Sequence, residues 1–186
     1  GTGDIAFRIL NRLNGADKEP CSDARVTVVD ASELMLRTGR DRALDAGNLN
    51  RIDWLQGDAE CLPIEDQCID VYTIAFGIRN FTRIDRALAE AHRTLRPGGR
   101  FLCLEFSRVL LPLLSSAYDA YSFKVLPALG EIVTGNREAY QYLAESIRRF
   151  PDQDAFADLI GAAGLEQIKV RNLSGGIAAL HSAWRI

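Results

Sequence analysis

The feature that most constrains this fold is an alternation of short apolar strands with amphipathic helices over residues 26–107. The run RVTVVD is rich in β-branched residues and ends on an acid, and SELMLRTGRDRALDAG follows it as a helix. We expect Ser32 to cap the start of that helix and Gly47 to end it. The runs RIDWLQGD, IDVYTIAFGI and RFLCLEF predict three further strands. A helix that begins at a Thr82–Asp85 capping pair and ends at RPGG precedes the last of them. The alternation predicts a parallel sheet with helices on both faces.

Residues 108–150 interrupt this alternation, because they are irregular, aromatic and rich in short helical patches. The run PDQDAFADLIGAAG then predicts a helix that Gly164 stops. LEQIKVRNL and GGIAALHSAWRI are typical of two closing strands joined around Gly175 and Gly176. We therefore expect one domain over residues 1–186, with 108–150 as an insertion that covers the substrate.

The chain opens with a glycine turn, GTGD, that leads directly into a helix. Ile5, Ile9 and Leu13 lie four residues apart and form the apolar face of that helix. A glycine turn of this kind normally follows a buried strand, and no strand precedes it here. We expect the chain to be a fragment of a longer polypeptide whose missing first strand is central in the sheet, between the strands that end at Asp30 and Phe76. On its own the chain would then leave two strand edges unpaired and bind its cofactor poorly or not at all.

Composition and charge argue against several classes of function. The net charge of -3 gives no reason to expect a nucleic-acid partner. No apolar run approaches the roughly 20 residues that cross a bilayer. The four cysteines show neither CxxC nor cysteine–histidine spacing, so we expect reduced thiols and no metal. His92, on a helix, and His181, in a closing strand, are interpreted as structural residues.

Glycines and acids follow the predicted strands, where ligands of open α/β folds bind. Glycines let backbone N–H groups approach a ligand, and the start of a helix favours an anionic group. An acid after the next strand can accept hydrogen bonds from ribose hydroxyls, although Asp30 taken alone fits a helix cap better. An acid after the third strand can accept from an adenine amino group, while the next backbone N–H donates to the ring. The full GxGxxG of dinucleotide-binding proteins is not visible, and GTGD fits adenosylmethionine enzymes better. The candidate cofactor-binding residues are Gly1, Thr2, Gly3, Asp4, Asp30, Asp58 and Ala59.

Eight segments of the sequence resemble one known family. GTGDIA, VVDASELML, GDAECLP, YTIAFGIRNFT, EAHRTLRPGGRFLCLEFS, YDAYSFKVLPALGEIVTG, YQYLAESIRRFPDQDAFADLIGAAG and GGIAALHSAWRI are similar to the ubiquinone/menaquinone biosynthesis C-methyltransferases. AFGIRNFT and YLAESIRRFPDQ are specific to that family, and the sequence around YTIAFGIRNFT resembles its mitochondrial members more closely. The family usually reads LPF and FD in this region, and this chain has Ile64 and Ile69 in place of the two phenylalanines, which is a conservative change. The resemblance implies a Rossmann-like class I methyltransferase fold, mostly parallel with an antiparallel strand near the C-terminus.

The resemblance also implies S-adenosylmethionine as donor and a polyprenyl benzoquinol as acceptor, in ubiquinone biosynthesis. A ring carbon becomes nucleophilic when the phenolic proton leaves, so the site must orient the ring and stabilise a phenolate. Arg79 and Asn80 follow the fourth strand and are the candidate catalytic residues. Arg79 would stabilise the phenolate oxygen directly or through a water, because a guanidinium group stays protonated and is a poor base. Asn80 would orient that water or the ring hydroxyl. The alternative makes Arg79 a salt-bridge partner of a carboxylate such as Glu105.

The apolar and aromatic part of residues 108–150 fits a tunnel for a polyprenyl tail or a membrane surface. Packing on the protein's own core or on a second subunit is the alternative. Tyr118, Tyr121 and Phe123 are the candidate substrate-binding residues, and Tyr142 is assigned to the same cover.

The family further implies a peripheral position on the matrix side of the mitochondrial inner membrane, or in the cytoplasm if the source is bacterial. Expected partners are other quinone-biosynthesis enzymes and a second copy of the chain. Two other functions stay open, namely a demethylmenaquinone methyltransferase and a non-catalytic lipid-binding scaffold. The acids, Arg79 and Asn80 that follow the strands argue against the scaffold.

Overall fold

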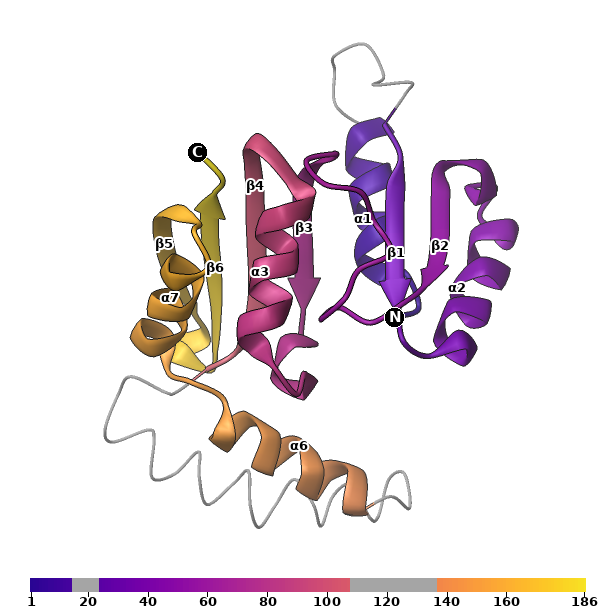
Figure 1. Cartoon of the computed structure of the whole chain (residues 1–186). Helices are drawn as coiled ribbons and strands as arrows, with labels where there is room; N and C mark the ends of the chain where they lie inside the picture. Colours follow the sequence, from indigo (N-terminus) through magenta and orange to yellow (C-terminus); the bar gives the residue numbers. More distant parts are fainter. Residues whose placement is uncertain (15–23, 108–136) are drawn as a thin grey trace. The chain divides into compact units, whose positions relative to one another are not determined.

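The structure is a computed structural model that describes residues 1–14, 24–107 and 137–186 (Figure 1). It divides into two compact units, Gly1–Ile64 and Glu65–Ile186. Each unit has its own sheet and its own buried core, and each is described by itself.

The first unit is a two-stranded parallel sheet with two α-helices. Its elements are α1 (Asp4–Asn14), β1 (Val26–Asp30), α2 (Glu33–Asp45), the 3-10 turn η1 (Leu49–Arg51) and β2 (Ile52–Gln56). The predicted capping of α2 is confirmed. Ser32 precedes the helix, and its side chain accepts a hydrogen bond from the N–H of Met35 at 3.4 Å. Gly47 follows the helix with a left-handed φ of 68°.

Both helices of the first unit pack on the same face of its sheet. Val28 and Trp54 are paired across β1 and β2, so their side chains share that face. Around them lies a core made of buried Ala6, Leu10, Ala43 and Ile52, with Phe7, Val26, Val28 and Trp54 packed against it. α1 is amphipathic as predicted, but its buried face carries Ala6 and Leu10, whereas Ile5 of the predicted face is 42% exposed.

The second unit is a four-stranded mixed sheet in the order β3-β4-β6-β5. Its strands are β3 (Ile69–Ala75), β4 (Leu95–Phe106), β5 (Glu166–Leu173) and β6 (Ala178–Trp184). Its helices are η2 (Ile78–Asn80), α3 (Ile84–Thr94), α6 (Arg137–Arg149), α7 (Gln153–Ala162) and η4 (Ser174–Gly176). β3 and β4 are parallel, whereas β6 runs antiparallel to both β4 and β5, which confirms the two predicted closing strands.

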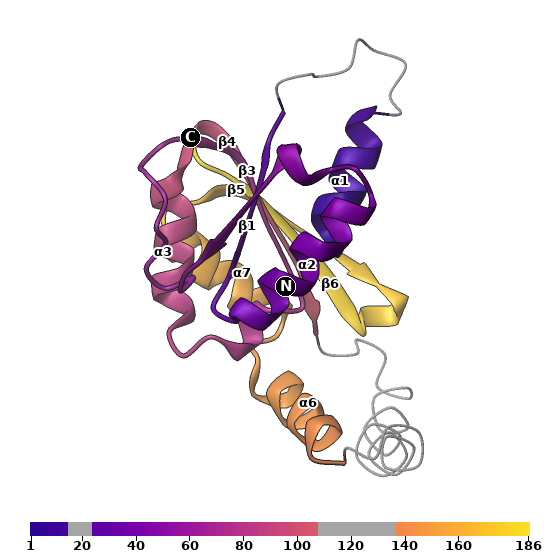
Figure 2. The same ribbon diagram turned by 90° about the vertical axis from the view of Figure 1, so that its right-hand side faces the viewer.

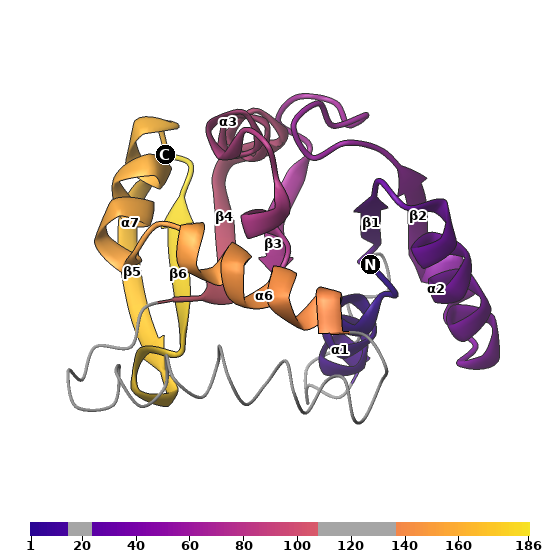
Figure 3. The same ribbon diagram turned by 90° about the horizontal axis from the view of Figure 1, so that it is seen from below.

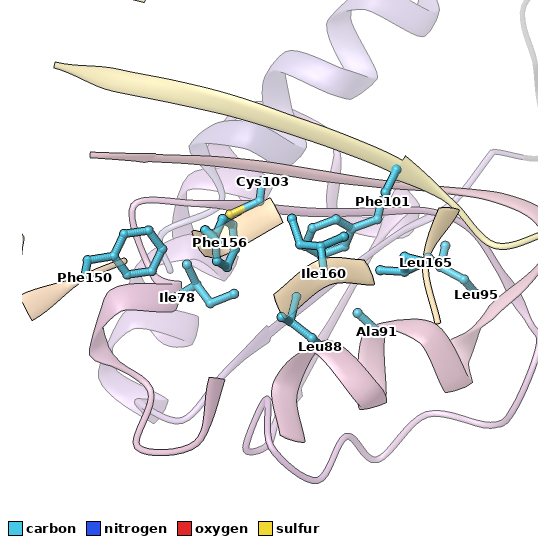
Figure 4. Packing of buried hydrophobic residues seen from close by; sticks show 11 residues of the cluster. Ile78, Leu88, Ala91, Leu95, Phe101, Cys103, Phe150, Phe156, Ile160 and Leu165 are labelled. Carbon is cyan, nitrogen blue, oxygen red and sulfur yellow. The ribbon is translucent and has the colours of Figure 1, made fainter. Parts of the chain in front are cut away.

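Helices α3 and α7 cover one face of this sheet (Figure 2). Figure 4 shows their apolar side chains between the helices and the strands, with Leu88 from α3 and Phe156 and Ile160 from α7 next to Phe101 and Cys103 from β4. Burying a side chain the size of leucine or phenylalanine contributes about 1.5–3 kcal/mol. Helix α6 instead lies across the end of the sheet where β3 and β4 finish (Figure 3).

Three local predictions for this unit need correction. β4 already begins at Leu95, so RPGG lies within the strand bounds, because the N–H of Gly98 and the carbonyl of Gly99 pair with the backbone of Arg185. α3 begins at Ile84, and Arg83 rather than Thr82 occupies its N-cap position. The guanidinium of Arg83 pairs with Asp85 at 2.9 Å. β3 ends at Ala75, one residue before the end that the sequence predicts.

Each sheet has two edge strands, β1 and β2 in the first unit and β3 and β5 in the second. Among residues 1–14, 24–107 and 137–186, β1 pairs only with β2, and β3 pairs only with β4.

Candidate functional site

The candidate site residues fall into two groups, one in each unit. In the first unit, Gly3 gives the opening turn its shape. Its φ is 83°, in the left-handed region, and a Cβ at this position would lie 2.6 Å from Cη2 of Trp54. The carbonyl of Gly3 accepts the N–H of Phe7 at 2.9 Å, so the first turn of α1 begins directly after the glycines. Only glycine fits at this position.

Asp4 is held by two neighbours at the start of α1. Its Oδ1 accepts from Nη2 of Arg42 at 2.8 Å, and its Oδ2 accepts from the hydroxyl of Thr2 at 2.6 Å. These hydrogen bonds, that of Arg42 first, lower the pKa of Asp4 to about 2. Its carboxylate is therefore committed to the protein's own turn.

Arg42 links helix α2 to the glycine turn, a role that sequence reasoning missed. Besides Asp4, its Nη1 donates to the carbonyl of Thr2 at 3.2 Å, and its guanidinium carbon lies 5.3 Å from the centre of the Phe7 ring. Nothing in the sequence distinguishes Arg42 from Arg37 or Arg40 on the same helix.

Asp30 lies at the carboxyl end of β1, as predicted. Its Oδ1 accepts the backbone N–H of Ser32 at 2.7 Å. This contact supports the interpretation of Asp30 as part of a helix start. A carboxylate has about four lone-pair positions, so this contact does not exclude a ligand.

Asp58 and Ala59 follow β2 in a tight turn next to the end of β1. The N–H of Gly57 donates to the carbonyl of Asp30 at 3.2 Å, which joins the two strand ends. The exposed side chain of Asp58 accepts the N–H of Glu60 at 2.9 Å through Oδ1. Ala59 is half-buried. The acids of two adjacent strands therefore lie at the same edge of the sheet, as the sequence predicts.

In the second unit, Arg79 and Glu105 form a buried ion pair at the carboxyl ends of β3 and β4. Nη1 of Arg79 lies 2.8 Å from Oε1 of Glu105, and the side chains are 10% and 1% exposed. The same Nη1 donates to the carbonyl of Phe76, and the guanidinium carbon lies 5.2 Å from the centre of the Phe106 ring. The alternative that pairs Arg79 with Glu105 is thus confirmed.

This ion pair leaves part of the arginine free. Nε of Arg79 is buried and has no hydrogen-bond partner among the residues that the structure describes. Glu105 accepts two further hydrogen bonds, from the backbone N–H of Phe106 at 2.8 Å and from that of Arg79 at 3.4 Å. Glu105 is therefore an anchor that fixes the arginine in place.

Asn80 is exposed and is joined to α6 by one hydrogen bond. The hydroxyl of Tyr142 donates to Oδ1 of Asn80 at 3.1 Å. The amide NH₂ is then the group that Asn80 offers to a ligand. The pairing of these two residues, 62 positions apart, could not be found from sequence periodicity.

The two histidines have structural positions. His181 is 2% exposed, and its Nε2–H donates to the carbonyl of Gln153 at 3.0 Å, while burial lowers the pKa of its imidazole. His92 is half-buried on α3, and burial lowers its pKa as well. Within the described ranges, no group of three His, Cys, Asp or Glu side chains could hold a metal ion.

Most of the predicted substrate cover, with Tyr118, Tyr121 and Phe123, lies outside the described residues. The part of that cover within the described residues is α6, which includes Tyr142. No helix in the described ranges has both the length and the apolar composition needed to span a membrane.

Comparison with known proteins identifies the family. The model of the ubiE/COQ5 methyltransferase family matches residues 1–185. The chain belongs to this family. The methyltransferase is 55% identical to the ubiquinone/menaquinone biosynthesis C-methyltransferase UbiE of Dinoroseobacter shibae. The alignment spans 186 residues, which are 100% of this chain and 71% of the relative. A relative with the same name from Paracoccus denitrificans is also 55% identical, with the same coverage of both chains.

Solved structures confirm the class I methyltransferase fold. The [4+2]-cyclase SpnF superposes with a TM-score of 0.70 at 17% identity, over 100% of this chain and 71% of that protein. A SAM-dependent methyltransferase from Aquifex aeolicus gives a TM-score of 0.66 at 13% identity, over 100% of this chain and 79% of the other. At these identities the likeness concerns the fold alone. The two named relatives are bacterial, and they give no support to the predicted mitochondrial location.

Proposed function

We propose that this methyltransferase moves a methyl group from S-adenosylmethionine to a ring carbon of a polyprenyl benzoquinol in quinone biosynthesis. The observation on which the proposal rests most is the glycine turn at Gly3, where a residue without a Cβ is required by the ring of Trp54. The relatives at 55% identity, named for ubiquinone and menaquinone biosynthesis, support the choice of acceptor.

The residues of the first unit fit the donor. Gly1 and Gly3 carry no side chain, so the backbone of this turn can approach a ligand closely. The N–H groups at the start of α1 favour the carboxylate of the donor's amino acid part. Asp30 retains lone pairs for ribose hydroxyls. Asp58 would accept a hydrogen bond from the adenine amino group, and the N–H of Ala59 would donate one to the adenine ring. S-adenosylmethionine, when bound, supplies the electrophilic methyl group.

Arg79 would act on the acceptor through electrostatics. Its guanidinium is buried and anchored by Glu105, so little reorganisation is needed when negative charge develops on a ring oxygen. The unpaired Nε–H is the donor available for that oxygen or for a water bound to it. Because Glu105 already neutralises much of the charge, we expect the directed N–H group to matter more than the net charge.

Asn80 would orient the ring hydroxyl or the water. Tyr142 occupies its carbonyl oxygen, which leaves the amide NH₂ turned toward an acceptor atom. A hydroxyl that accepts from this NH₂ has its own proton directed elsewhere, so Asn80 would help the phenolic proton to leave through water.

Turnover assays with matched arginine variants test the proposal. Full-length protein is given S-adenosylmethionine with a benzoquinol or a naphthoquinol acceptor, and donor binding is measured separately by calorimetry. We expect Arg79→Ala and Arg79→Lys to lower turnover about 100-fold or more while donor affinity stays within about twofold. The matched control is Arg83→Ala, which removes an exposed arginine that pairs with Asp85 and should leave turnover unchanged.

Each outcome decides one part of the proposal. Full turnover by Arg79→Ala would remove the catalytic role of Arg79. Methylation of the naphthoquinol in place of the benzoquinol would make the enzyme a menaquinone methyltransferase. Absence of donor binding by the unaltered protein would favour the lipid-binding scaffold.

We further propose that the polyprenyl tail brings the enzyme to a membrane surface as a peripheral protein, at the mitochondrial inner membrane if its source is a eukaryote, where it meets other quinone-biosynthesis enzymes or a second copy of itself. Co-sedimentation with vesicles that contain or lack a polyprenyl quinone tests this point. Equal recovery in the supernatant in both cases would contradict it.

A further inference from the structure

Phe76 has a backbone conformation that aromatic residues rarely adopt. Its φ is 53°, in the left-handed region, directly after the last residue of β3. The other described non-glycine residues with positive φ are all polar, namely Gln67, Gln167 and Ser174. For a bulky side chain this region is an outlier, and such outliers cluster at functional sites.

The surrounding backbone holds Phe76 in this conformation from both sides. Its N–H donates to the carbonyl of Leu104 in β4 at 2.8 Å. Its carbonyl accepts from Nη1 of Arg79, the same atom that pairs with Glu105. The strained residue is therefore fixed by the sheet and by the proposed catalytic arginine.

Phe76 is partly exposed within the described residues. The side chain is 40% exposed, although a phenylalanine at a strand end gains stability by burial. Phe106 supports it from one side, with the two ring centres 4.6 Å apart and tilted by 43°. Arg79 in turn lies over the Phe106 ring at 5.2 Å. The protein thus holds an exposed aromatic surface rigidly, one residue from Gly77 and three from Arg79.

We infer that Phe76 is the surface against which the aromatic ring of the methyl acceptor packs, which makes it a specificity-determining residue. The inference rests on the proposed function and deepens it, because it names the part of the site that recognises the acceptor as a flat ring. A ring packed there is contacted through its face, while its oxygens remain free for the N–H groups of Arg79 and Asn80. An acceptor without an aromatic ring has no comparable contact.

The test compares side chains of similar size with and without a ring. Phe76→Tyr and Phe76→Leu both place a bulky residue at the same strained φ, so they share the backbone cost. Phe76→Asn removes the ring but suits positive φ, and therefore protects the experiment against a variant that fails to fold. Trp184→Leu, which removes an aromatic ring that packs under Arg100 in the same unit, is the matched control.

Binding of a hydroquinone with a single isoprenyl unit is measured by calorimetry, together with KM and kcat for the same compound. We expect Phe76→Leu and Phe76→Asn to raise Kd and KM about five- to tenfold, and Phe76→Tyr and Trp184→Leu to stay within about twofold. Donor affinity should stay unchanged in all four variants. Urea denaturation confirms that each variant is folded.

The outcomes separate this inference from the proposed function. If the unaltered protein methylates the hydroquinone and Phe76→Leu binds it equally well, the role of Phe76 is overturned and the proposed function stands. If the unaltered protein binds the ring without methylating it and Phe76→Leu loses that binding, the proposed function fails and the ring-binding role stands. Equal losses in Phe76→Leu and Trp184→Leu would also overturn the inference.

Discussion

Glu105 and Arg79 are joined by a buried ion pair, with 2.8 Å between Oε1 and Nη1 and a Glu105 side chain that is only 1% exposed. Burial of two charges costs desolvation energy that their attraction must offset, so such a pair is a poor source of net stability. Removal of one partner, however, leaves the other charge buried alone. The pair therefore couples the folding of the second unit to the position of the proposed catalytic group.

The first prediction concerns this coupling. Glu105→Gln keeps a side chain that can accept from the backbone N–H groups but leaves the Arg79 charge unneutralised, so we expect a loss of about 3–5 kcal/mol in the free energy of unfolding. Arg79→Met combined with Glu105→Gln removes both charges, and should recover most of that loss while methyl transfer stays absent. Urea denaturation and a turnover assay measure the two effects. A double variant that is less stable than Glu105→Gln alone would contradict the argument.

The second prediction concerns Arg42 and the donor. Arg42→Ala removes the hydrogen bonds to Asp4 and to the carbonyl of Thr2, which fix the glycine turn. Because the pair is exposed and screened by solvent, we expect little loss of stability, but a rise of about fivefold in the Kd for S-adenosylmethionine.

Arg37→Ala is the matched control for Arg42, because it removes the same charge from α2 and breaks only an exposed pair with Glu33. Calorimetry on both variants separates the local effect from the net charge. An equal loss of affinity in both would show that long-range charge, and not the shape of the turn, is responsible.

The third prediction concerns Gly3. Gly3→Ala meets both a left-handed φ of 83° and Cη2 of Trp54 at 2.6 Å, whereas Gly47→Ala meets a φ of 68° and open space. We expect Gly47→Ala to cost about 1 kcal/mol through backbone strain, and Gly3→Ala about 1–3 kcal/mol more through overpacking.

Urea denaturation of the two alanine variants and of Gly3→Ala with Trp54→Phe measures these costs. The smaller ring in the last variant should restore part of the loss. Equal destabilisation by Gly3→Ala and Gly47→Ala would show that the Trp54 contact is not limiting.

The sequence predicts what depends on local pattern. The strand before Asp30, the cap at Ser32 and the stop at Gly164 follow from periodicity and from residues next to one another in the chain, and all are confirmed. The start of β4 differs because its first residues pair with Arg185, more than 80 positions away, an arrangement that no local pattern encodes.

The candidate site divides in the same way. Arg79 and Asp30 could be found because each follows a strand, and strand ends of parallel sheets gather ligand-binding groups. The role of Arg42 could not be found, since three arginines on α2 have equal propensity and only tertiary packing selects one. The left-handed φ of Phe76 was equally hidden, because the residue continues an apolar run that is typical of a strand interior.

The last prediction concerns pH and the buried imidazole of His181. Burial holds its pKa in the folded state below the ordinary value of 6.5, although Gln153 and Asp154 act in the opposite direction. As the pH falls through 6.5, the unfolded chain therefore binds a proton before the folded protein does. The contribution of His181 to stability is complete above that pH and is lost progressively below it.

His181→Gln keeps an N–H donor for the carbonyl of Gln153 and cannot titrate. We expect the free energy of unfolding of the unaltered protein to decline between pH 7 and about pH 5, and the slope to be smaller in His181→Gln. His92→Gln is the comparison, because burial also lowers the folded-state pKa of His92 but its side chain is less buried, so we expect a smaller change of slope than in His181→Gln. Urea titrations at several pH values give the slopes, and a slope that His181→Gln leaves unchanged would mean that His181 is protonated equally in both states.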